Sequence, residues 1–483
     1  MEIKIGKLDW IFLLLCLIVG IVAEESFFRG QIGLSFFVFI VAFYMLVFWR
    51  FRAFSFSHQR LGYFVLIVIW LLSAGYYLYD VMPFYALNIL VIPALVIFHL
   101  ALITAPKNIE WNRLFFIGYM LKRLIDSIVF NAKFASHATK LFSNSNKSAQ
   151  HEAWKKILIG IAISIPVLFV VLQLLISADA QFERLIGMLP ELINLSPEYV
   201  IRFIIILFCT FGFFGYLQVL LQRKIQIHPR EVSTVTLDGI ITLTVLVLLN
   251  LVYLLFIVVQ FKYFFNGALA DGYTYAEYAR RGFFELLFVT LINLTVTTIV
   301  ITFTKNLVGA LKNVIKFALS ILVLASGVLL VSAFMRMNLY EEAYGYTFTR
   351  VLVVSFMIFL MVILAYTLVK IWLEKLSLFH FYFIATLIYY AGINMVNLNK
   401  VVADKNIARY EETGKIDIYY FESLSTTGTL ALIELYEKHP NIPGLESKLQ
   451  QRKMDREYLK GDTWQSQNLT RSRANERLGE LDL

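Results

Sequence analysis

Three ionisable residues near the middle of the chain have the spacing of an ion-paired helical face. Glu277, Arg281 and Glu285 are four residues apart, so a helix would place them on one side and bring their opposite charges together. Tyr278 lies among them and adds a phenolic hydroxyl. Such a group could bind an ion or a charged substrate, or it could secure the beginning of a helix by ion pairs.

A second charged segment has the same character. It contributes Arg336, Glu341, Glu342, Tyr344 and Arg350. Arg281 could pair with Glu341 or Glu342, and Arg350 could pair with Glu285, which would join the two segments into one cap. Guanidinium and carboxylate groups could also supply acid, base and phosphate contacts. No pattern names a reaction, so an enzyme acting on a lipid-linked substrate is the weakest of the functional hypotheses.

Polar side chains also recur at helical spacing inside two apolar segments. The residues are Thr290, Asn293 and Thr297 in one segment and Tyr390, Asn394 and Asn397 in the other. Within a membrane such stripes either join helices through hydrogen bonds or line a polar path, and joining is the commoner use.

The signatures of soluble enzymes are absent from the sequence. It contains no phosphate-binding GxxxxGK[ST] motif, no HExxH, no GxSxG and no CxxC. The seven histidines are scattered, and no pair has the spacing of metal ligands on a helix. We therefore expect no cofactor and no metal, and we lean against an enzyme.

The composition indicates what must position these residues. Of 483 residues, 59% are hydrophobic and only 16% are charged, whereas ordinary globular chains are about 45–50% apolar and about 25% charged. The surplus apolar surface requires lipid as a second solvent. Residues 1–397 are thus predicted to be an all-α polytopic bundle of about eleven spans. The segments are 8–24, 31–49, 61–79, 82–104, 156–177, 199–222, 238–260, 283–304, 311–335, 348–372 and 377–397.

Basic residues set the predicted orientation. If the spans alternate, Lys and Arg concentrate in the loops on the side of the N-terminus, above all in 105–156. The positive-inside rule then places the N-terminus in the cytosol and the C-terminus outside. Glu285 would lie at the outer membrane boundary, where an ionisable group is costly unless it is partnered. Because the basic residues flank spans, nucleic acid is not expected as a partner.

Two segments lie outside this pattern. Residues 113–135 are apolar but contain Lys122, Arg123 and Asp126, so we expect an amphipathic helix along the inner leaflet or one packed beneath the spans. From about residue 398 the chain becomes polar. Residues 398–462 are predicted to form a small extracytoplasmic helical tail, and 463–483 a polar, flexible terminus.

Three blocks of this sequence resemble one known family. They are Tyr-Ala-Glu-Tyr-Ala-Arg-Arg-Gly-Phe-Phe-Glu-Leu, ending at Leu286; Ala-Tyr-Gly-Tyr-Thr-Phe-Thr-Arg, ending at Arg350; and Arg409-Tyr410 followed by Gly-Lys-Ile-Asp417 and Tyr420. Together they resemble a family of bacterial polytopic membrane proteins catalogued as a domain of unknown function. The resemblance covers roughly residues 260–425. It implies a bacterial plasma-membrane protein and implies no activity.

These observations favour a binding, sensing or envelope-associated signalling protein with an outer cap formed by loops 261–283 and 336–349. A transporter or flippase for a small or lipidic substrate is the alternative. Expected partners are membrane lipids and an envelope or cytosolic protein. The expected location is the bacterial plasma membrane, crossed many times.

Overall fold

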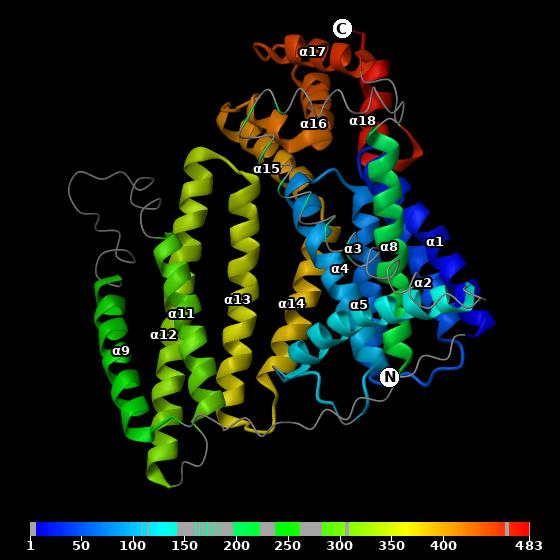
Figure 1. Ribbon diagram of the computed structural model, residues 1–483. Coiled ribbons are helices and arrows are strands. Elements are labelled where there is room, and N and C mark those ends of the chain that lie inside the picture. The colour runs from blue at the N-terminus through cyan, green and yellow to red at the C-terminus, as the bar shows by residue number, and fades with distance from the viewer. Residues whose placement is uncertain are drawn as a thin grey trace. The chain divides into compact units, whose positions relative to one another are not determined.

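The computed structural model describes residues 6–107, 109–113, 115–142, 197–222, 237–260, 283–304, 309–458 and 463–482, with isolated positions between 160 and 182. Every regular element in these residues is a helix. The all-α prediction is therefore confirmed (Figure 1).

Nine of the described helices are long and apolar enough to cross a membrane. They are α1 (Lys7–Phe28), α3 (Gln59–Leu78), α4 (Met82–Thr104), α8 (Pro197–Leu221), α9 (Gly239–Gln260), α11 (Phe283–Phe303), α12 (Ala310–Tyr344), α13 (Phe348–Trp372) and α14 (Leu378–Met395). At 1.5 Å per residue, helices of about 20 residues match a hydrocarbon core about 30 Å thick. The apolar α2 (Leu34–Arg50) is shorter. The predicted span 156–177 lies almost wholly outside the described residues, so the number eleven stays a prediction.

The chain divides into two compact units. The first comprises Met1–Leu66, Pro93–Ile225 and Asp462–Gln467, and the second comprises Ile67–Ile92, Gln226–Gly461 and Asn468–Leu483. In the first unit α1 packs against α2 and α8. The guanidinium of Arg50 on α2 lies 2.9 Å from a side-chain oxygen of Asp9 and 2.9 Å from one of Gln218. One polar contact therefore joins three helices of this unit.

Helix α5 (Phe115–Phe142) of the first unit corresponds to the predicted amphipathic segment. It packs against α8, and Arg123 is buried there, where it donates to the Tyr119 hydroxyl and to the Val219 carbonyl. Lys122 remains exposed. Ile117, Leu121, Ile125 and Ile128 are also exposed. The helix thus combines a packed face with an uncovered apolar face.

Helix α12 is the centre of the second unit and packs against α9, α11 and α13. Leu322, Leu329 and Ala333 on α12 are almost completely buried. Leu248 and Leu255 on α9 remain exposed, which is the arrangement expected of a helix whose outer face meets lipid. The long, apolar α12 therefore provides a core that its neighbours cover.

The polar tail folds around a core of its own. Its elements are α15 (Leu398–Thr413), η2 (Tyr420–Leu424), α16 (Ser425–Lys438), α17 (Leu445–Tyr458) and α18 (Leu469–Glu480). Leu432, Leu435, Leu445 and Leu449 are almost completely buried at its centre. Figure 1 shows α15, α16 and α17 beyond the end of α12 and α13 where these two helices are joined. We call α15–α18 the tail domain.

The structure differs from the sequence prediction at the C-terminus, where 463–483 were expected to be flexible. This stretch contains a short helical turn, η3 (Trp464–Ser466), and α18. Asn468 donates to the carbonyls of Tyr76 and Tyr79, and Thr470 donates to the carbonyl of Leu78. The small polar side chains that suggested disorder therefore bind the free carbonyls at the end of α3.

Candidate functional site

The first predicted cluster has little described geometry. Glu277, Tyr278 and Arg281 lie outside the described residues, as does nearly all of loop 261–283. Glu285 lies in the first turn of α11 and is exposed. Its proposed pairing with Arg350 is not formed, because Arg350 instead donates to the Gly345 carbonyl and covers the ring of Tyr340, 4.2 Å away.

The stripe on α11 faces the neighbouring helix. Thr290, Asn293 and Thr297 are buried. The amide of Asn293 donates to the hydroxyl of Ser326 on α12 at 2.9 Å, and Thr290 donates to its own helix at Leu286. This geometry supports the hypothesis that the stripe joins helices.

The stripe on α14 makes the same kind of contact with α4. Asn394 accepts a hydrogen bond from Asn88 at 2.8 Å, and the Tyr390 hydroxyl donates to the other end of the Asn88 amide at 2.7 Å. Asn397 caps α15 by accepting from the Lys400 N–H, and it also donates to the Thr427 hydroxyl. The second stripe therefore continues from the spans into the tail domain.

The second predicted cluster lies where α12 meets the tail domain. Helix α12 ends at Tyr344, and Gly345, which follows it as the C-cap, has φ +82° and ψ 175°. The Asn406 side chain on α15 donates to the Tyr346 carbonyl at 2.8 Å and accepts from the Tyr346 N–H at 3.0 Å. One amide side chain thus pairs with the backbone of the turn in both directions.

Arg409 and Tyr420 complete this interface. The Arg409 guanidinium donates to the carbonyls of Glu342 and Ala343, at 3.2 Å and 3.0 Å. These carbonyls belong to the last turn of α12, where a positive charge is favourable. The Tyr420 hydroxyl accepts from the Phe348 N–H at 2.8 Å. This N–H lies in the first turn of α13, where backbone donors have no partner within the helix. We call this set, Glu342–Phe348 with Asn406, Arg409 and Tyr420, the turn–tail contact.

Beneath the turn–tail contact lies a buried carboxylate. Glu341 is 3% exposed and Arg336 is 5% exposed, whereas Tyr344 is open to solvent. One oxygen of Glu341 has no hydrogen-bond partner among the residues that the structure describes. Arg350 and Lys405 supply positive charge to it. The residues chosen from the sequence in this segment therefore gather at one end of α12, although Arg336 and Glu341 face inward and Tyr344 faces outward.

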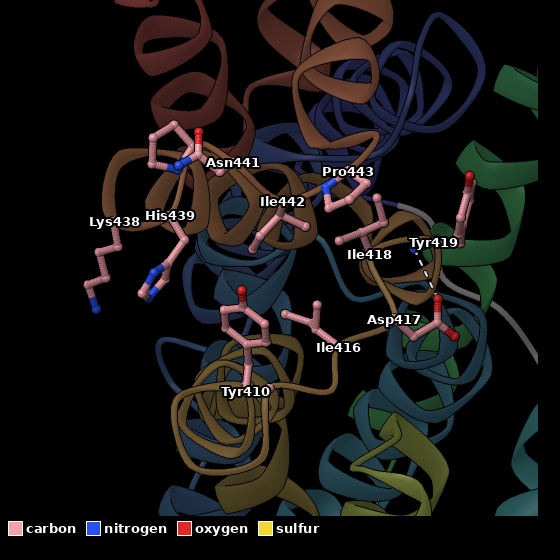
Figure 2. A pocket seen from close by; sticks show the side chains of 12 residues that line it. Tyr410, Ile416, Asp417, Ile418, Tyr419, Lys438, His439, Asn441, Ile442 and Pro443 are labelled. Carbon is pink, nitrogen blue, oxygen red and sulfur yellow. Dashed lines mark hydrogen bonds between the residues drawn. The ribbon is translucent and has the colours of Figure 1, made fainter.

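A hollow of about 620 Å³ lies on the tail domain. Its lining residues are Tyr410, Gly414, Ile416, Asp417, Ile418, Tyr419, Lys438, His439, Pro440, Asn441, Ile442 and Pro443. Figure 2 shows the three isoleucine side chains at its centre, with Tyr410, Lys438 and His439 on one side and Asp417 on the other. The tail hollow therefore has an apolar floor and a polar rim.

The polar groups of the rim are held in place by neighbours. A carboxylate oxygen of Asp417 accepts from the N–H groups of Tyr419 and Tyr420, at 3.1 Å and 3.2 Å. The Lys438 ammonium lies 3.0 Å from a Glu434 oxygen, and this hydrogen bond raises the pKa of Lys438. The rings of Tyr410 and His439 meet edge to face at 5.3 Å. Lys438 is thus kept charged, and the packed rings of Tyr410 and His439 form one side of the tail hollow.

Sequence reasoning did not identify the tail hollow. The run His-Pro-Asn-Ile-Pro-Gly, 439–444, was a usable signal for it, because two prolines in a break between helices restrict the backbone of the loop. Asn406, Arg409 and Tyr420 were likewise not chosen as site residues, although they stand in or beside the third resembling block.

The sequence pattern of one protein family matches residues 66–435, which is most of the chain. The chain belongs to the DUF4153 family. The family is described as a domain of unknown function, so membership confirms the resemblance and assigns no activity. No curated protein and no solved structure matches the chain.

The DUF4153 match covers the two parts of the candidate site differently. The turn–tail contact lies wholly within residues 66–435, whereas Lys438–Pro443 of the tail hollow follow the end of the match. In the part of the DUF4153 chain that the structure describes, no three His, Cys, Asp or Glu side chains are grouped so as to hold a metal ion. The turn–tail contact therefore lies entirely within the family domain, whereas the tail hollow lies only partly within it.

Proposed function

We propose that this protein is a multi-pass bacterial plasma-membrane protein that binds a ligand at its tail domain on the outer face and signals occupancy to its spans. One observation carries the proposal. Helix α15 contributes Tyr410 to the tail hollow, and the same helix holds the α12–α13 turn through Asn406 and Arg409. A ligand that moves or fixes Tyr410 therefore acts on the helix that caps α12.

The tail hollow suits a small amphipathic ligand. Its volume falls within the range of about 300–1,000 Å³ common for small-molecule sites. Ile416, Ile418 and Ile442 would contact an apolar group, while His439 and Asn441 offer polar contacts at the rim. The same features suit an apolar side chain of an envelope protein, which makes a protein partner a second possible occupant.

The turn–tail contact is able to transmit binding. Its hydrogen bonds satisfy backbone groups at the end of α12 and the beginning of α13, and these groups would lose their partners if α15 moved away. Couplings between sites in allosteric proteins are typically about 1–3 kcal/mol, a range that a few such hydrogen bonds can supply.

Contacts made by the tail support its predicted side. In the first unit, Gln467 accepts from the Leu34 N–H and Gln465 donates to Glu25. In the second unit, Asn399 donates to the Asp80 carbonyl, in the α3–α4 turn. Alternation of the spans assigns both turns to the outer face. The tail contacts both turns, which supports the prediction that the tail also lies on the outer face.

The test uses the full-length protein in lipid nanodiscs. Saturation-transfer NMR against a library of small amphipathic molecules should find binders that Ile442→Trp abolishes by filling the hollow and that the smaller change Ile442→Val retains. Binding should slow amide hydrogen exchange at residues 342–348. Binders unaffected by Ile442→Trp, or exchange unaltered at the turn, would contradict the proposal.

The transporter or flippase hypothesis has weaker support. It depends on a polar path along the stripes of α11 and α14, and Asn293 and Asn394 in these stripes instead make hydrogen bonds to α12 and α4. We therefore favour binding and signalling.

A further inference from the structure

Three lysines gather around Glu374 at the end of α12 opposite to the turn–tail contact. The ammonium groups of Lys312 and Lys316 lie 2.8 Å and 2.6 Å from the same oxygen of Glu374. Lys370, in the last turn of α13, donates to the backbone carbonyl of Glu374. Three positive charges thus share one negative charge, and we call these four residues the lysine cluster.

The lysine cluster retains unused capacity for an anion. Each ammonium carries three donors, and Glu374 accepts only one from each of Lys312 and Lys316. The hydrogen bonds from these two lysines lower the pKa of Glu374 from 4.5 to about 2, so the excess charge remains near two positive at neutral pH. The side chains of Lys312 and Lys316 are 40% and 19% exposed, so a ligand can reach them.

An apolar track begins beside the lysine cluster. Phe317, Ile321 and Leu324 of α12 are exposed, and their spacing of four and three residues places them on one helical face. Trp372 is 54% exposed and donates from its indole to Ser320, at 3.1 Å. A tryptophan held beside a basic group and an exposed apolar helix face is typical of the membrane–water boundary.

We propose that the lysine cluster binds the phosphate of an anionic phospholipid, with Trp372 at headgroup level and an acyl chain along the track of Phe317, Ile321 and Leu324. Basic pockets between membrane helices bind such headgroups. A free phosphate would use the charge but not the apolar track, which is why we assign a lipid. This inference does not depend on the proposed function of the tail domain.

The experiment measures lipid binding to the detergent-solubilised full-length protein by native mass spectrometry. Probes are short-chain phosphatidylglycerol, short-chain phosphatidylcholine and inorganic phosphate. Lys312→Gln with Lys316→Gln should weaken phosphatidylglycerol binding about 25-fold, since each lysine near a headgroup contributes about 5-fold. The matched control, Lys400→Gln with Lys415→Gln, removes two exposed lysines of the tail domain and should leave binding unchanged.

The variant Glu374→Gln distinguishes between two roles of the lysine cluster, a lipid-binding site and a structural salt bridge. It removes only the competing negative charge, so binding of phosphatidylglycerol should tighten, by about 5-fold. Weaker binding in this variant would mean that the cluster serves only to hold α12 and α13 together. Equal binding of phosphatidylcholine, full competition by millimolar inorganic phosphate, or equal loss in the control pair would each overturn the assignment of an anionic lipid.

Discussion

At the scale of single residues, Asn406 has the most specific role. Its side chain makes both hydrogen bonds that a paired backbone would make to Tyr346. An alanine at this position leaves one donor and one acceptor of the turn without their partners. The turn–tail contact therefore depends on a chemical group, an amide, more than on the burial of surface.

Asn406→Ala should lower the free energy of unfolding by about 1–3 kcal/mol, the cost of leaving partly buried polar groups unpaired. The measurement is thermal or denaturant unfolding in detergent. Gln451→Ala, at an exposed position on α17, is the control and should change stability by less than about 0.5 kcal/mol. Equal losses of stability in the two variants would show that the hydrogen bonds of Asn406 do not stabilise the turn.

Gly345→Ala tests the backbone of the same turn. The combination of φ +82° and ψ 175° is accessible essentially to glycine alone, so alanine should cost about 1–3 kcal/mol. A Cβ there would also lie 3.0 Å from Asn406 Oδ1. Gly392→Ala, within α14, adds a Cβ that lies more than 4 Å from every atom outside the local helix backbone, and it should be neutral or stabilising. A neutral Gly345→Ala would show that the turn adopts another conformation.

At the scale of elements, hydropathy was sufficient to find helices and insufficient to pair them. The apolar segments 283–304 and 348–372 nearly coincide with α11 and α13, because a bilayer requires about 20 apolar residues whatever lies beside them. The pairing of Asn293 with Ser326, or of Asn394 with Asn88, depends on helix rotation. A single sequence shows that these polar residues share a helical face, but it does not show which helix that face contacts.

The lysine cluster predicts a pH dependence at this scale. The folded-state pKa of Glu374 lies below its ordinary value of 4.5, so its ion pairs stabilise the fold above about pH 4.5. That contribution is lost as the pH falls from 4.5 towards 2. The wild-type protein should therefore lose more apparent melting temperature between pH 6 and pH 3 than Glu374→Gln does. If the melting temperatures of the two proteins fell equally with pH, the ion pairs of Glu374 would not stabilise α12 and α13.

At the scale of the whole molecule, the sequence predicts a boundary between the spans and the tail. Composition changes near residue 398, and α15 begins at Leu398. The fold of the tail domain was harder to predict, because its core of Leu432, Leu435, Leu445 and Leu449 is assembled from short helices, one of which, α17, is polar on average. The tail hollow arises only when those helices and the 439–444 loop are brought together.

The side of the membrane on which the tail domain lies decides whether it can bind an extracellular ligand. The most direct measurement is labelling of single cysteines in intact cells with a membrane-impermeant maleimide, after Cys16 and Cys209 have been replaced. Lys415→Cys on the tail domain should be labelled without permeabilisation, and Lys375→Cys, beside the lysine cluster, only after it. Labelling of Lys375→Cys alone in intact cells would contradict the account.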